Sequence, residues 1–219
     1  MRIHLLLSKN SKRVPFNYQS FLTGALHKWL GKDNKEHGEL SLYSFSWLNK
    51  AQIQKDGFDF PNGTSWFISS YDDSFIKKLI ESIQVDPSIC FGLTVKEIII
   101  QENPVFKNNE IFKTASPVFI KRNTPDGIKF YYHNDPQSSA WMTETLKHKL
   151  EKAGLEKNNV EVSFDQSYTK ATVKVSDYNG IKNKANICPV IIKGTPEQLA
   201  FAWNVGIGNS TGIGFGALH

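Results

Sequence analysis

The sequence predicts an α+β protein with two tandem ferredoxin-like (RRM-like, βαββαβ) domains and a glycine-rich loop near the chain end. Three observations lead to this prediction. Hydrophobic periodicity in the first half gives the order β-α-β-β-α-β. Apart from an extra hairpin or two, the second half repeats that order. A polar stretch from Asn103 to Glu110 separates the halves, so we expect one domain over residues 1–103 and another over residues 111–219.

Composition restricts the classes of function. The chain has 219 residues, 40% of them apolar, and no stretch is apolar for long enough to span a membrane. The short apolar run in MRIHLLLSKN fits a first strand better than a signal peptide. The 2 cysteines lie in unrelated contexts, which fits a reducing cytoplasm and disfavours a disulfide framework or a metal site. The net charge of +5 favours a polyanionic partner.

The first half has two amphipathic helices. Apolar residues recur at helical spacing over residues 17–30, and Gly31 ends that helix. The second helix begins at Asp72 or Asp73, since either residue is a good N-cap. Strands are expected over residues 2–7, 40–47, 66–71 and 93–100.

The second half also has two helices. Asp135-Pro136 opens the first, which ends at Gly154 and carries an apolar stripe of Met142, Leu146, Leu150 and Ala153. Thr195, Pro196 and Gln198 form a capping-box start for the second. Strands are expected over residues 111–121 (interrupted at Pro117), 128–133, 160–164, 171–175, 187–192 and 213–218.

The sequence GIGNSTGIGFG follows the last helix and precedes the last expected strand. A dinucleotide-binding glycine motif has the opposite order, strand then helix, and no GK[ST] follows to make a Walker loop. Glycines at positive φ can aim successive N–H groups at one anion, which in a basic protein is a phosphodiester backbone. The alternative is a turn that merely requires flexible residues. We expect the loop to bind RNA through Gly206, Gly208, Gly212, Gly214 and Gly216.

Two histidines lie in one window of the first half. His27 is on the first helix, off its apolar stripe, and His37 is in the polar loop that follows. Two imidazoles and an ammonium suffice for RNA cleavage without a metal: one imidazole takes a proton, the other gives one, and the amine stabilises negative charge. Both histidines can also be ordinary surface residues, and their spacing disfavours zinc. The lysines that crowd this window are Lys28, Lys32, Lys35 and Lys50.

Three stretches resemble one protein family. They are PFNYQSFLTGALHKWLG with His37 and LSLYSFSWL, then KTASPVFIK, and finally ICPVIIKGTPEQLAFAWNVGIGNSTGIGFGAL. Together they resemble the CRISPR-associated endoribonucleases that process repeat transcripts, which belong to the repeat-associated mysterious protein (RAMP) superfamily. The final stretch resembles the superfamily's C-terminal signature, and the first points to its nuclease branch.

The resemblance implies a function and a site. His37 matches the catalytic histidine, and His27 falls where many members carry a tyrosine and some a second histidine. The catalytic lysine is Lys35 or Lys50, and Lys28 joins the glycines in binding RNA. The products would be a 2′,3′-cyclic phosphate and a 5′-hydroxyl, formed without metal or cofactor.

The implied partners are CRISPR repeat RNA and other CRISPR-associated effector proteins, with the chain a monomer or homodimer in the cytoplasm. Two alternatives remain: a non-catalytic subunit that coats or caps guide RNA, and a single-stranded RNA-binding module that stacks bases on a sheet. The two histidines favour the enzyme.

Overall fold

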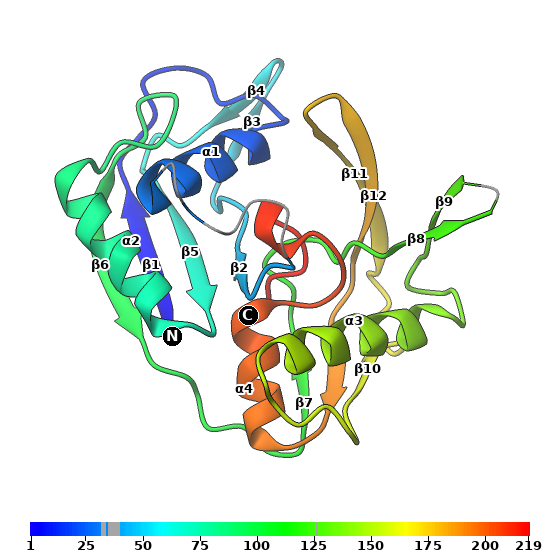
Figure 1. The fold of residues 1–219 in the computed structure, drawn as a ribbon. Helices are drawn as coiled ribbons and strands as arrows, with labels where there is room; N and C mark the ends of the chain where they lie inside the picture. The colour runs from blue at the N-terminus through cyan, green and yellow to red at the C-terminus, as the bar shows by residue number, and fades with distance from the viewer. Residues whose placement is uncertain (32–33, 35–39, 126) are drawn as a thin grey trace.

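The computed structural model describes residues 1–31, 34, 40–125 and 127–219. Its first half holds a four-stranded antiparallel sheet in the order β2-β5-β1-β6 (Figure 1). The chain passes through β1, α1, β2, β5, α2 and β6, with one small hairpin, β3 and β4, inserted after β2. This strand order and connectivity are those of a ferredoxin-like fold. The bounds are Arg2–Leu7 for β1, Gln19–Leu30 for α1, Tyr43–Phe45 for β2, Gln52–Gln54 for β3, Gly57–Asp59 for β4, Thr64–Ser70 for β5, Asp73–Val85 for α2 and Val95–Gln101 for β6.

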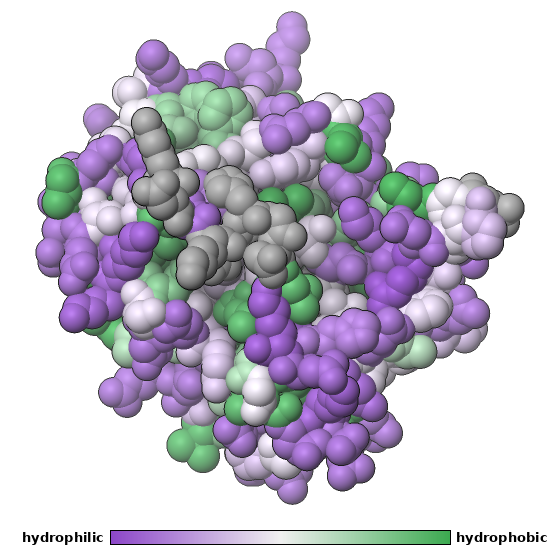
Figure 2. Space-filling model, in the orientation of Figure 1, coloured by the Kyte–Doolittle hydropathy of each residue, from purple (hydrophilic) through white to green (hydrophobic). Residues whose placement is uncertain are grey.

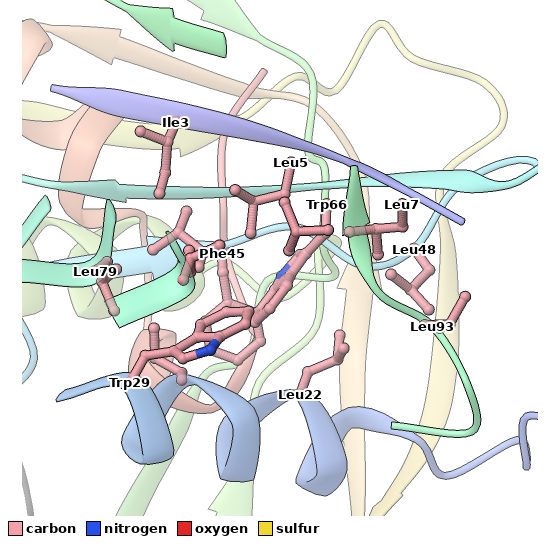
Figure 3. Packing of buried hydrophobic residues seen from close by; sticks show 14 of the residues in the cluster. Ile3, Leu5, Leu7, Leu22, Trp29, Phe45, Leu48, Trp66, Leu79 and Leu93 are labelled. Atoms are coloured by element: carbon pink, nitrogen blue, oxygen red, sulfur yellow. The ribbon is translucent and has the colours of Figure 1, made fainter. Parts of the chain in front are cut away.

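A hydrophobic core fills the space between this sheet and its two helices. Strand alternation turns Ile3, Leu5 and Trp66 toward the helices, and α1 supplies Leu22 and Trp29 (Figure 3). All five side chains are at most 2% exposed, so the helices lie on one face of the sheet.

The second half repeats the arrangement in reduced form. Its sheet has the order β10-β13-β7, and a single bridge between Thr114 and Leu218 takes the place of the fourth strand. Two hairpins are inserted, β8 with β9 and β11 with β12. The bounds are Asn109–Phe112 for β7, Lys121–Thr124 for β8, Gly127–Phe130 for β9, Ser138–Lys152 for α3, Glu161–Phe164 for β10, Thr172–Tyr178 for β11, Ile181–Ile187 for β12, Val190–Lys193 for β13, Pro196–Val205 for α4 and Thr211–Ile213 for the short 3-10 helix η1.

The predicted fold class is confirmed, and three expected strands need correction. The strand expected over residues 213–218 is wrong: Gly214 and Gly216 have positive φ, and only a single bridge forms there. The strand expected over 187–192 is two strands, because the chain leaves β12 at Ile187 and begins β13 at Val190. The strand expected over 111–121 ends at Phe112 and continues only as isolated bridges.

One buried arginine joins the two halves. Arg2 of β1 lies between the rings of Phe67 and Trp203, with its guanidinium carbon 3.9 and 3.4 Å from their centroids. Its Nη2 donates to the carbonyl oxygens of Trp203 and Leu218, both at 2.9 Å. Burial lowers the pKa of Arg2 to about 9. The contact fixes α4, and the glycine-rich loop that follows it, against the first sheet. None of the helices in the described ranges is long and apolar enough to cross a membrane.

Candidate active site and nucleic-acid interface

His27 lies in the last turns of α1 and is half-buried. Its Nδ1 is 3.3 Å from Oδ1 of Asn34, and the Asn34 amide nitrogen donates to the carbonyl of Gly31 at 2.6 Å. Because the amide nitrogen is used in that bond, Asn34 presents its oxygen to the imidazole, so Nδ1 is the donor. In the neutral ring, Nε2 then carries the lone pair. Asn34 therefore fixes the orientation of the His27 ring and its neutral tautomer.

The helix face beside His27 is open at one point. Gly24 lies one turn earlier on α1, and a Cβ atom built there meets nothing within 4 Å. The helix contacts η1, and β2 also packs on η1, where Tyr43 Oη donates to the Gly212 carbonyl at 3.4 Å. The glycine-rich loop thus lies beside the helix that carries His27 (Figure 1).

Two of the predicted catalytic residues, His37 and Lys35, lie outside the described residues. Lys50 is described and is exposed, with a φ of 56°. Two residues before it, the Leu48 N–H donates to Tyr18 Oη at 3.1 Å, next to the start of α1. His27 is nine residues further along, or about 13 Å at the α-helical rise. The backbone just before Lys50 is thus anchored near the start of α1, whereas His27 lies in the last turns of that helix.

Lys28, predicted to bind RNA, is engaged within the protein. Its amine contacts Asp86 at 2.8 Å and donates to the carbonyl and hydroxyl of Ser88 at 2.6 and 3.0 Å. The amine and Ser88 hold the pKa of Asp86 well below its usual range. In this arrangement Lys28 joins the end of α1 to the end of α2.

The five glycines of the loop are buried, and the protein itself fills the space beside them. A Cβ at Gly208 would lie 2.5 Å from the Phe119 carbonyl oxygen, and one at Gly214 would lie 2.7 Å from the Phe45 ring. A Cβ at Gly206 would lie 2.7 Å from the carbonyl oxygen of Gly216. At the other two positions the collisions are closer still, with Ser41 for Gly212 and with the Ile207 carbonyl for Gly216.

The loop's backbone is also largely committed to internal hydrogen bonds. The N–H groups of Gly206, Gly214 and Gly216 donate to carbonyls of Ala202, Thr211 and Pro117. The structure thus gives the five glycines a packing role, and RNA binding by the loop stays a prediction. The half-exposed residues of the loop are Asn209, Ser210 and Ile213.

Sequence reasoning missed the residue that anchors this loop, Lys149 of α3. It is 1% exposed, and its Nζ donates to the carbonyls of Val205 and Gly206 and to Thr211 Oγ1. Burial lowers its pKa to about 7. Its signal in the sequence was a lysine at a core position, between Leu146 and Leu150 of the apolar stripe.

Two cationic side chains lie near the loop. Arg122 Nη1 contacts Asn209 Oδ1 at 3.3 Å, and the Lys174 amine lies 4.7 Å from the centroid of the Trp47 ring. Trp47 Nε1 in turn donates to the Gly214 carbonyl at 2.7 Å. Figure 2 shows mainly hydrophilic side chains over α3 on this face. Asn209 and Arg122 border a pocket of about 300 Å³, also lined by Leu40, Lys121, Asn123, Glu144, Thr145 and His148.

No group of three His, Cys, Asp or Glu side chains that could hold a metal ion occurs in the described part of the chain.

Two ferredoxin-like folds followed by a buried glycine-rich loop define the class of this protein, and the comparisons give its family. Residues 101–219 match the family model described as CRISPR associated protein Cas6, C-terminal. This match covers more than half of the 219 residues, so the chain belongs to the Cas6 family. The family resemblance predicted from the sequence is confirmed. A comparison with the curated proteins gives no match.

Solved structures share the fold over the whole chain. A Cas6-related protein from Pyrococcus furiosus has a TM-score of 0.86 at 20% identity, covering 100% of this chain and 97% of its own. A structure described as CRISPR associated protein Cas6 has a TM-score of 0.82 at 26% identity, with 100% and 98% covered. A RAMP protein described as binding different RNA substrates has a TM-score of 0.85 at 17% identity, with 100% and 98% covered.

Proposed function

We propose that this chain is an endoribonuclease that cuts CRISPR repeat RNA in the precursor transcript, without a metal, to release guide RNAs. The observation that carries the proposal is the placement of His27. In a member of the Cas6 family, an oriented imidazole lies on a helix that contacts the glycine-rich loop. The RNA is the polyanion favoured by the net charge of +5. Other effector proteins are proposed as further partners of a monomer or homodimer.

The proposed reaction needs two proton transfers. One imidazole, from His27 or His37, takes the proton of the 2′-hydroxyl, and the freed oxygen attacks the adjacent phosphorus. The bond from phosphorus to the 5′-oxygen breaks, and the other imidazole gives that oxygen a proton. The products are a 2′,3′-cyclic phosphate and a 5′-hydroxyl. An ammonium from Lys35 or Lys50 stabilises the negative charge that develops on the phosphoryl oxygens, and the single variants Lys35→Ala and Lys50→Ala decide between them.

The test is cleavage of the protein's own repeat RNA in excess EDTA. The wild-type protein should cut at one site, and the 5′ product should carry a cyclic phosphate. His37→Ala should lose most cleavage while keeping RNA affinity, since one imidazole contributes little to backbone binding. His133→Ala is the matched control, because His133 lies between β9 and α3 in the other half.

Three results would contradict the proposal. Activity that is lost in EDTA and restored by Mg²⁺ or Mn²⁺ would overturn the metal-free mechanism. A His37→Ala variant that cuts at the wild-type rate would overturn the histidine assignment. If the wild-type protein binds the repeat RNA and leaves it intact, the chain is a non-catalytic RNA-binding subunit.

A further inference from the structure

The Lys149 amine joins three elements at one buried point. Lys149 belongs to α3, and its acceptors Val205 O and Gly206 O, at 2.9 and 3.2 Å, lie at the C-terminal end of α4. The third acceptor, Thr211 Oγ1 at 2.9 Å, is in the first residue of η1. Both ends of the loop segment from Gly206 to Thr211 are therefore held by one side chain.

The chemistry of this contact suits a charged amine. An ammonium has three donors, and three acceptors surround it, whereas a neutral amine would leave one acceptor without a partner. The C-terminal carbonyls of a helix carry partial negative charge, which also favours a cation there. No carboxylate is paired with Lys149 in the part of the chain that the structure describes. The loop thus rests on a buried amine to which the described residues supply no counter-charge.

We propose that Lys149 is a positioning residue for RNA binding: it holds the glycine-rich loop in its binding shape and places one positive charge beneath it. The proposal rests on the proposed function in one respect, that RNA lies against the half-exposed residues of the loop. Lys149 acts through the loop and touches no RNA, since its side chain is buried. An apolar side chain of similar length would remove both the three hydrogen bonds and the charge.

The charge makes the proposal measurable through pH. Burial lowers the pKa of Lys149 to about 7, so the free protein is only partly charged there at neutral pH. A phosphodiester near the loop favours the ammonium and raises that pKa, so RNA binding takes up a proton. Affinity should then fall as pH rises above 7, by up to about tenfold per pH unit for one linked proton.

Few other titratable groups face Lys149. Its partners from α4 and η1 are carbonyls and a hydroxyl, which do not titrate. On α3, His148 is exposed, and the Lys152 amine donates to the Leu40 carbonyl at 3.1 Å. Lys149→Met retains both His148 and Lys152, so a comparison of variants isolates the contribution of Lys149.

The experiment compares Lys149→Met with the wild-type protein and with Lys157→Met. Lys157 is a surface lysine of the α3–β10 connection, paired with Glu151, and serves as the control. Repeat RNA affinity is measured from pH 6 to 8.5, and amide hydrogen exchange is measured over residues 206–214. We expect Lys149→Met to bind about tenfold more weakly at pH 6.5, to lose the pH dependence above 7 and to exchange faster in the loop alone. Lys157→Met should match the wild-type protein in all three.

A second pair of variants guards against misfolding of Lys149→Met. Thr211→Val removes one acceptor with little change in shape, and Thr211→Ser keeps the hydroxyl. The proposal predicts that amide exchange in the loop is faster and RNA binding is weaker in Thr211→Val, and that Thr211→Ser matches the wild-type protein in both.

Unchanged loop exchange and unchanged affinity in folded Lys149→Met or Thr211→Val would overturn the proposal, as would an unchanged pH dependence in Lys149→Met. If the wild-type protein does not bind repeat RNA, the proposed function is wrong. In that case amide exchange alone decides whether Lys149 anchors the loop.

Discussion

The two sides of the candidate site use glycine for opposite reasons. On α1, a Cβ added to Gly24 meets nothing within 4 Å, so the helix surface one turn before His27 is open. In the glycine-rich loop, a Cβ added to Gly216 would collide with the Ile207 carbonyl, so the missing side chain lets two backbone segments touch. Beside Gly24 there is room for a ligand, whereas the space beside Gly216 is filled by protein. A glycine-rich sequence therefore does not by itself indicate a binding loop.

The comparison also separates two contributions to the site. The first half supplies a half-buried imidazole whose tautomer is set by Asn34. The second half supplies a rigid loop, held by Lys149 and by the bond from Ile207 N–H to the Gly216 carbonyl at 2.8 Å. Removing the His27 imidazole should therefore alter the reaction, whereas adding a side chain to a buried glycine of the loop should alter the fold.

The largest effect is expected at His27. His27→Ala removes an imidazole that we propose takes or gives a proton, and such a group typically contributes about 10²–10⁴-fold to the rate. The single-turnover cleavage rate at saturating RNA should fall by a factor in this range, while the thermal midpoint of unfolding stays close to that of the wild type. A rate within twofold of wild type would show that His27 is an ordinary surface residue with no role in the reaction.

Gly216→Ala should have the next largest effect, on stability. Its φ of 65° disfavours an L side chain, and the new Cβ would meet backbone that cannot move aside cheaply. The free energy of unfolding in urea should fall by about 3 kcal/mol or more. A loss below about 1 kcal/mol would show that the loop is loosely packed.

Stability should also depend on pH through Lys149. Its pKa in the folded state, about 7, lies below the 10.5 of the unfolded chain, so the unfolded chain binds more protons between these values. The free energy of unfolding should therefore rise between pH 7 and 8.5, with Lys149 contributing on the order of 1–2 kcal/mol. Urea unfolding of wild type and Lys149→Met at both pH values measures the difference, and an equal pH dependence in the two proteins would contradict the lowered pKa of Lys149.

Gly24→Ala should have the smallest effect and the opposite sign. Alanine is favoured over glycine inside a helix by about 0.5–1 kcal/mol, and nothing obstructs the methyl group. The variant should unfold at higher urea and fold normally, which makes it the matched control for Gly216→Ala. A loss of stability would mean that α1 packs more closely at this point than its open surface indicates.

Much of the fold could be predicted because its signals are local. Asp72 caps α2 through the Ser74 N–H, and Thr195 with Gln198 forms the expected capping box of α4. The β11–β12 hairpin was also readable, since Asn179-Gly180 is a type I′ turn sequence and both residues have positive φ. The strand expected over residues 171–175 is thus the first strand of a hairpin whose turn is marked in the sequence.

The site was harder to predict because its contacts are distant in sequence. The sequence around Gly216 does not show that Ile207 lies against it, and the sequence around Lys28 does not show that its amine pairs with Asp86. Lys149 lay within an apolar stripe, but its three acceptors lie more than 50 residues away. The position of Lys149 within the apolar stripe indicates that its amine has buried hydrogen-bond acceptors, but it does not identify them.

The central claim is that the 2′-hydroxyl of the RNA attacks the adjacent phosphorus, and one substrate tests this claim most directly. Repeat RNA with a single 2′-deoxy sugar at the cut site keeps every phosphate and every base, so it should bind with unchanged affinity. The wild-type protein in EDTA should leave this RNA intact while it cuts the all-ribose strand, because the deoxy sugar has no oxygen to attack the phosphorus. Cleavage of the deoxy substrate at the same site would contradict the account, since the attacking oxygen would then come from elsewhere.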